Sequence, residues 1–173
     1  MDYYLKLAKE TIEKYIKTNK IPLLPKKIPQ EMLSKKAGAF VSIHTKDGPL
    51  RGCIGTFLPT RPNIALEIIT NAISSATQDP RFPPITEKEL SDFVYSVDVL
   101  SKPKTISNRK AIDPKKYGLI VSTPDGRRGL LLPHIPGVDT PEQQIKICCQ
   151  KAGIEPKEKV KLETFIVERH GRV

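Results

Sequence analysis

Two hydrophobic periodicities alternate along the chain, one typical of helices and the other typical of strands. In residues 3–18 apolar side chains recur three and four positions apart, with lysines and glutamates between them, which predicts an amphipathic helix. A second helical stripe covers 62–78, and the proline that begins it is expected to be the first helical residue. A third stripe covers 140–153, where Thr140 and Gln143 have the spacing of a capping box.

Alternating apolar and polar positions predict strands in the segments between these helices. The expected strands are 38–45, 50–57, 93–100, 119–121, 129–132 and 160–169. Asp-Gly pairs at 47–48 and 125–126 favour tight turns, so the strands on either side of each pair are expected to form hairpins. The polar, proline-containing residues 101–116 are expected to form a loop.

The first hairpin is expected to have two chemically different faces. With the Asp-Gly pair at its tip, Ser42 faces Cys53 and His44 faces Arg51. These four side chains then lie on one face, and the core side carries Val41, Ile43 and Ile54. A bulge in the returning strand would change this register.

The elements together predict an α+β protein that forms a single domain over residues 1–173. Apolar residues make up 38% of the chain and charged residues 28%, which is typical of a folded globular protein. No apolar run approaches the roughly 20 residues of a membrane helix, so no membrane association is predicted. The first residues lack the apolar core of a secretory signal, and the expected location is therefore the cytoplasm.

The formal net charge of +10 favours partners that carry phosphate groups. The lysines are interleaved with glutamates, however, and no aromatic residues alternate with them as a base-stacking surface would require. A basic module that binds nucleic acid or a protein partner is therefore kept as an alternative, and nucleic acid is not the favoured ligand.

The three cysteines do not predict a disulfide framework, because their number is odd and Cys148 and Cys149 are adjacent. Zinc-type spacing is also missing, since the sequence has no C-x-x-C and its histidines are scattered. We therefore predict neither a metal nor a cofactor.

Cys53 has the strongest candidate chemistry in the sequence. A neighbouring cation lowers the pKa of a thiol and makes it a better nucleophile, and Arg51 is expected on the same face of the strand. Gly52 and Gly55 would leave space for a substrate beside the thiol. The alternative is that Cys53 is a small buried hydrophobic residue, which is the commonest role of a free cysteine.

Two further segments carry candidate binding residues. Asp79, Arg81 and Phe82 lie on a proline-stiffened loop, where an acid and a base two residues apart can hold a polar ligand or clamp the loop itself. His134 follows a strand end, where site residues are common, and could pair with Cys53 and Asp79 as a base.

The segment LRGCIGTF at 50–57, with GAFVSI before it and ALEIITNAISSATQDPRFPP after it, resembles the AMMECR family, also called AmmeMemoRadiSam system protein A. The resemblance continues through GLIV, RRGLLLP and the KAG helix end, and so covers nearly the whole chain. It implies two unequal lobes. The larger α/β lobe would take in both chain ends, with a mixed sheet and flanking helices, and the smaller lobe would be inserted.

The resemblance also implies that residues 50–57, 79–82 and 129–133 gather around a cleft. Family members commonly carry glutamine where this chain has His134, which makes His134 a cleft-lining residue rather than a required base. The family travels with Memo proteins and radical SAM proteins, which suggests a shared pathway but no assigned reaction. Three interpretations remain open: a cysteine-dependent enzyme or enzyme subunit, a binding module, and a motif that only specifies the fold.

Overall fold

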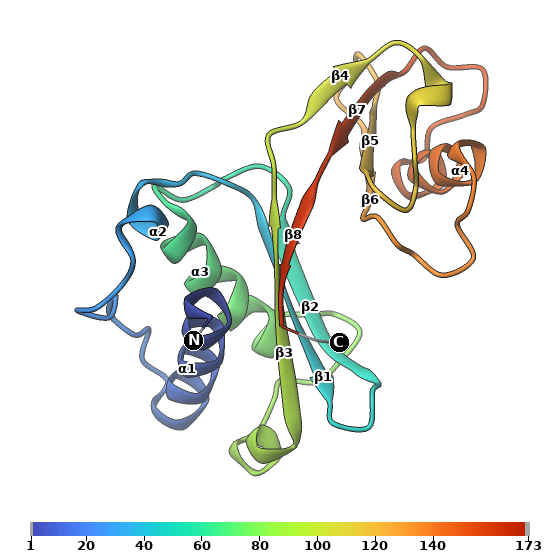
Figure 1. The fold of residues 1–173 in the computed structure, drawn as a ribbon. Helices are drawn as coiled ribbons and strands as arrows, with labels where there is room; N and C mark the ends of the chain where they lie inside the picture. Colours follow the sequence, from blue (N-terminus) through green and yellow to red (C-terminus); the bar gives the residue numbers. More distant parts are fainter. Residues whose placement is uncertain (1, 172–173) are drawn as a thin grey trace. The chain divides into compact units, whose positions relative to one another are not determined.

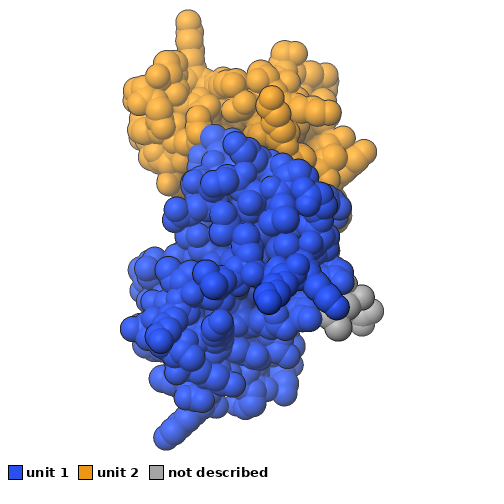
Figure 2. All heavy atoms as spheres, turned by 90° about the vertical axis from the view of Figure 1, so that its left-hand side faces the viewer, with its two compact units in different colours: residues 1–100, 168–173 blue, residues 101–167 orange. Residues whose placement is uncertain are grey.

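The computed structural model describes residues 2–171 and divides the chain into two compact units (Figure 1; Figure 2). The larger unit comprises residues 1–100 and 168–173, and the smaller unit comprises residues 101–167. Each unit has its own sheet and its own cluster of buried apolar side chains. The expected α+β class is confirmed.

The larger unit is built on a four-stranded sheet with the order β2-β1-β3-β8. Its strands are β1 (Ala39–Thr45), β2 (Leu50–Thr56), β3 (Phe93–Leu100) and β8 (Val167–His170). Both β2 and β3 pair antiparallel with β1, where a mixed sheet was expected. Strand β3 lies beside β1 rather than beside β2.

Helices α1 (Tyr3–Thr18) and α3 (Ile64–Thr77) form the buried core of this unit together with one face of the sheet. The carboxylate of Asp2 caps α1 by accepting hydrogen bonds from the backbone N–H groups of Tyr4 and Leu5. Helix α3 is capped by Asn63, so the expectation that Pro62 is the first helical residue was wrong. The side chain of Asn63 supplies the acceptor, and the proline precedes the cap.

Two short elements complete the larger unit. Helix α2 (Gln30–Ser34) follows the proline-rich connector after α1. The 3-10 helix η1 (Glu87–Asp92) begins with a capping box formed by Thr86 and Glu89, and it leads directly into β3.

The smaller unit is a second antiparallel sheet with the order β4-β7-β5-β6. Its strands are β4 (Lys104–Ile106), β5 (Gly118–Ser122), β6 (Arg128–Leu131) and β7 (Lys161–Phe165), and it also contains η2 (Arg109–Ala111). Helix α4 (Pro141–Ala152) has the expected capping box at Thr140 and Gln143, and it ends at Gly153 in the left-handed conformation. The loop expected over 101–116 therefore contains a short strand and a helical turn.

The final strand expected over 160–169 is two strands in two different sheets. Strand β7 pairs with β4 and β5 in the smaller unit, and β8 joins the larger sheet after a break at Ile166. Within residues 2–171 no helix is long and apolar enough to cross a membrane.

Candidate functional site

Cys53 lies in the edge strand β2 on the face of the sheet opposite to α1 and α3. The register pairs Cys53 with Ser42, as expected, and Ser42 with Ser96 on β3. Val41 and Ile43 point into the core, while Ser42 and Cys53 are only partly buried. The hydroxyl of Ser42 donates a hydrogen bond to the Cys53 sulfur over 3.2 Å.

The backbone of Cys53 is held by the loop that follows α3. Its N–H donates to Oδ2 of Asp79 over 2.8 Å, and its carbonyl oxygen accepts from Nη2 of Arg81 over 3.4 Å. In an antiparallel edge strand both of these backbone groups point to the open side and need partners there. The sequence suggested that this loop either binds a ligand or clamps itself. The structure shows that it also binds the strand carrying Cys53.

Asp79 and Arg81 form a two-point ion pair. Nε of Arg81 donates to Oδ1 of Asp79 over 3.0 Å, and Nη2 donates to Oδ2 over 2.7 Å. These hydrogen bonds hold the pKa of the Asp79 carboxyl well below its usual range, against the effect of its burial. The Asp79 side chain is 3% exposed and that of Arg81 is 54% exposed, so the carboxylate is a buried anchor for an accessible cation.

Phe82 lies close to two guanidinium groups. Its ring centroid is 5.5 Å from the guanidinium carbon of Arg81 and 6.0 Å from that of Arg51. Contact with an aromatic face restricts an arginine side chain and adds attraction. Phe82 therefore helps to position Arg81 beside Cys53.

Arg51 does not lie where the sequence predicted. The register shifts between Ile43 and His44, so that Ile43 pairs with Gly52 and His44 pairs with Leu50 rather than with Arg51. Nε of Arg51 donates to Glu89 over 3.0 Å, and Nη1 donates to the carbonyl oxygen of Pro83 over 2.9 Å. Arg51 thus ties β2 to the segment around η1, and the cation whose charge favours the Cys53 thiolate is Arg81.

The thiol of Cys53 is not activated in this structure. Burial raises its pKa, and the opposing effects of the Ser42 hydroxyl and the Arg81 charge do not reverse this. The lowered pKa expected from a neighbouring cation is therefore not found. Near neutral pH Cys53 is a protonated thiol.

Gly52 and Gly55 were expected to leave space for a ligand, but in the structure they do not. A Cβ atom at Gly52 would lie 2.3 Å from the backbone oxygen of Ser75, which belongs to α3. A Cβ atom at Gly55 would lie 2.3 Å from Cγ of Phe40. Both glycines permit close packing, one against a helix and the other beneath an aromatic ring.

The sequence did not predict a second buried acid with an accessible arginine. Asp98 on β3 has a side chain that is 2% exposed, and it accepts hydrogen bonds from Nε and Nη2 of Arg169, each over 2.7 Å. Arg169 lies on β8, and its side chain is 49% exposed. A charged residue in the otherwise apolar strand FVYSVDVL was the available signal, because buried charges require partners.

His134 lies in the smaller unit, after β6. It is exposed, its φ of 59° is left-handed, and its N–H donates to the carbonyl oxygen of Pro114 over 3.0 Å. Gly129 of the same segment lets β6 approach α4, because a Cβ atom there would lie 1.9 Å from the carbonyl oxygen of Cys148. The expected cleft between two lobes stays a prediction, as does the approach of His134 to Cys53.

No metal site stands out beside these residues. Between Asp2 and Gly171 no three or more His, Cys, Asp or Glu side chains are grouped so that they could hold a metal ion. The groups that contact Cys53 are the Ser42 hydroxyl, the Asp79 carboxylate and the Arg81 guanidinium.

Comparison with known proteins identifies relatives along nearly the whole chain. The sequence model of the AMMECR1 family matches residues 5–170. A Thermotoga maritima protein is 52% identical over 168 residues, which are 96% of either chain. A Clostridium acetobutylicum protein is 46% identical over 98% of this chain, which spans only 36% of that relative. The crystal structure of an uncharacterised Pyrococcus horikoshii protein matches with a TM-score of 0.87 at 36% identity, covering 96% of this chain and 88% of that one.

Proposed function

The chain belongs to the AMMECR1 family, and we propose that the sheet face around Cys53 is its ligand-binding or active site. One observation carries the proposal. A buried carboxylate, Asp79, holds both the backbone N–H of Cys53 and the half-exposed guanidinium of Arg81. A buried charge is costly unless its partners are well placed, and here those partners position a thiol next to an accessible cation.

The geometry supports recognition of a ligand more directly than covalent catalysis. With its raised pKa, Cys53 is a hydrogen-bond donor and a weak nucleophile near neutral pH. Ser42 and Arg81 favour the thiolate, so a bound group that takes the proton would turn the same thiol into a nucleophile. An enzyme built on Cys53 therefore needs its ligand to complete the site.

The pH dependence of Cys53 alkylation tests the proposal. Folded protein is treated with iodoacetamide from pH 6 to pH 10.5, and mass spectrometry follows the peptide that contains Cys53. We expect labelling in the folded state with a midpoint above the value of about 8.5 for a free cysteine. Labelling that occurs only after unfolding would contradict the proposal, because the thiol would then be a packing residue.

Asp79→Asn and Ser91→Ala are the matched variants for this test. The first removes the charge that anchors Arg81, so the Cys53 midpoint should change. The second alters an exposed hydroxyl of η1 and should leave the midpoint unchanged. A midpoint that is the same in all three proteins would show that the acid–arginine pair does not act on the thiol.

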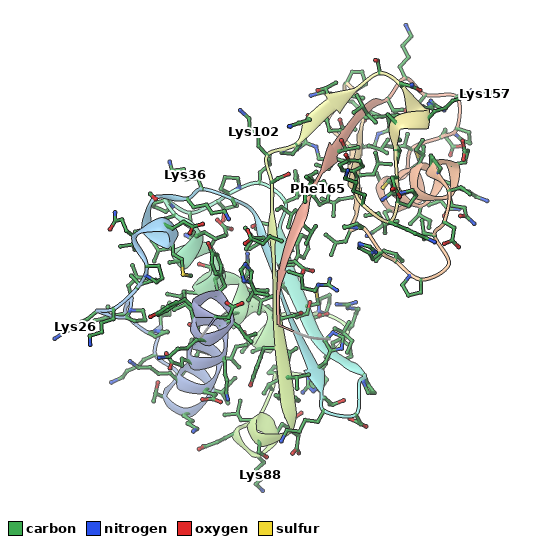
Figure 3. The ribbon with its side chains drawn as sticks, in the orientation of Figure 1. Lys26, Lys36, Lys88, Lys102, Lys157 and Phe165 are labelled. Atoms are coloured by element: carbon green, nitrogen blue, oxygen red, sulfur yellow. The ribbon has the colours of Figure 1, made fainter. Side chains whose placement is uncertain are left out.

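The alternative function is a basic binding module, and the net charge of +10 favours it. Lys26, Lys36, Lys88, Lys102 and Lys157 extend away from the ribbon (Figure 3). Titration with single- and double-stranded RNA and DNA at 50 mM and 200 mM salt tests it, since phosphate contacts give strongly salt-dependent binding. Absence of salt-sensitive binding would remove the nucleic-acid version.

The expected pathway with Memo-type and radical SAM proteins stays a proposal that rests on the family resemblance. A pull-down with such proteins from one genome, using wild-type protein and Asp79→Asn, tests it. Capture that depends on Asp79 would connect the pathway to the Cys53 site. Equal capture by both proteins would place the contact elsewhere, and no capture would contradict a direct complex.

A further inference from the structure

The larger sheet carries two arginines that are held in the same way. Arg81 is bound to the buried Asp79, and Arg169 is bound to the buried Asp98. In each pair the carboxylate is almost fully buried, while about half of the arginine side chain is exposed. Neither arrangement is an ordinary surface ion pair, in which both partners are mobile and solvated.

The way each arginine is bound leaves the Nη1 group of its guanidinium available. Both use Nε and Nη2 to hold the aspartate, so Nη1 points to a different edge. Among the described residues neither Nη1 makes a hydrogen bond. Arg81 also donates from Nη2 to the Cys53 carbonyl oxygen, so the donors that it offers a ligand are those of Nη1. Guanidinium donors with a fixed orientation are well suited to recognition of a carboxylate or phosphate group.

The two arginines flank the face that carries Cys53. The register places Cys53 opposite Ser42, which is opposite Ser96, and Asp98 lies two residues further along β3. Arg81 reaches the Cys53 carbonyl from the β2 edge, and Arg169 reaches Asp98 from β8 on the other side. Asp79 raises the pKa of Arg81, and Asp98 raises the pKa of Arg169. The negative charge of an ionised Cys53 raises the pKa of both arginines further, so both cations lie within electrostatic reach of the sulfur.

We propose that Arg81 and Arg169 bind an anionic group of the ligand, a carboxylate or a phosphate, next to Cys53. This inference rests on the proposed function and adds the chemical class of the ligand. Each arginine is neutralised by its aspartate, so recognition depends on directed N–H donors rather than on local excess charge. The positive net charge of the whole chain would still attract an anion from a distance.

Two alkylating reagents that differ in charge test the inference. Iodoacetate carries a carboxylate and iodoacetamide does not, and both react with the same sulfur. The ratio of their rates at Cys53 is measured in the folded protein and in urea-unfolded protein, which serves as the reference. We expect the folded ratio to favour iodoacetate by about tenfold relative to the reference, the low end for one hydrogen bond to a charged group.

Protection experiments separate the two sources of the anion. Inorganic phosphate and acetate are added in turn, with chloride at equal ionic strength as the control. Protection by phosphate alone indicates a phosphorylated ligand, and protection by acetate alone indicates a carboxylic acid. No protection by either anion would overturn the inference.

The double variant Asp98→Asn with Arg169→Gln tests the second arginine. It leaves the net charge of the chain unchanged and leaves no unpaired buried carboxylate, so the sheet is expected to fold. The ratio of the iodoacetate rate to the iodoacetamide rate should fall severalfold, and this ratio cancels any change in the Cys53 pKa because both reagents react with the same thiolate. Lys88→Gln removes an exposed cation from η1 and should keep the preference.

Failure of the inference and failure of the proposed function give different results. An equal ratio in folded and unfolded protein, with Cys53 still reactive, overturns the anion site alone. An unchanged preference in the double variant removes Arg169 from it. If neither reagent labels folded protein, the Cys53 site itself is wrong. Should the double variant not fold, the wild-type ratio and the protection experiment still decide the question.

Discussion

Replacing Gly52 by alanine separates two explanations of the glycines in the Cys53 strand. If Gly52 leaves space for a ligand, the added methyl group would reduce ligand access and leave stability nearly unchanged. If Gly52 permits helix packing, the methyl group would push α3 away from the sheet. The structure favours packing, because the new Cβ atom would lie 2.3 Å from the backbone oxygen of Ser75.

The expected loss of stability follows from what α3 contributes at this point. The Ser75 hydroxyl donates to the Val41 carbonyl over 2.6 Å and accepts from the Ile54 N–H over 2.8 Å. Overpacking in a core typically costs about 1–3 kcal/mol. Loss of the two hydrogen bonds would add about 1 kcal/mol each. We therefore expect Gly52→Ala to lower the free energy of unfolding by about 3–5 kcal/mol if both hydrogen bonds are lost.

Urea denaturation followed by circular dichroism measures this change. The two units need not unfold together, so the Cys53 labelling rate in urea serves as a second probe that reports on the larger unit. Ser74→Ala is the control, since its hydroxyl bonds only to the exposed Gln78 side chain and should matter by less than about 0.5 kcal/mol. A Gly52→Ala protein as stable as the control would refute the packing argument.

Three further predictions concern other fixed points of the fold. Asp79 has a lowered folded-state pKa, first because of Arg81. Its stabilisation is therefore present above the unfolded value of about 4 and is lost as the pH falls from there through the lowered folded-state pKa. Urea midpoints should therefore drop less from pH 7 to pH 3 in Asp79→Asn than in wild-type protein, and equal drops would contradict this. Glu67 is fully buried and accepts hydrogen bonds from Thr56, Thr60 and Arg61. In the same assay Glu67→Ala should lower the free energy of unfolding by about 2 kcal/mol or more, and Glu67→Gln should lower it by about 1 kcal/mol. Gly129→Ala should destabilise the smaller unit by about 1–3 kcal/mol, because the new Cβ atom would collide with α4. Hydrogen exchange of α4 and β6 measures this change, and unchanged exchange would show that α4 moves aside without loss of stability.

The ends of helices and the faces of the first hairpin were predictable, because the residues that determine them are close together in the sequence. Thr140, Gln143 and Gly153 mark both ends of α4, and the Thr86 and Glu89 pair marks the start of η1. The alternation in the first hairpin also assigned Val41, Ile43, Ser42 and Cys53 to the correct faces. These features depend on residues a few positions apart, which a single sequence displays.

The rest depends on pairings between distant residues. Asp79 holds a backbone group 26 positions away, and Arg169 holds a carboxylate 71 positions away, so no spacing in the sequence announces either contact. The break at Ile166 separates strands of two sheets, although the alternation of residues continues through it. At the register shift, Arg51 likewise bonds to Glu89 and Pro83 in a later segment.

These contacts change which residues of the segment 50–57 we interpret as functional. Close packing explains Gly52 and Gly55, and an ion pair with Glu89 explains Arg51. Cys53 is different, since it is only partly buried and lies outside the core cluster, and yet a buried carboxylate fixes its backbone. The functional argument therefore moves from the glycine-rich strand to the thiol and the two guanidinium groups beside it. If stability were the whole purpose of the Arg169 pair, replacing it by a neutral pair would alter unfolding and leave the reactivity of Cys53 toward anions unchanged.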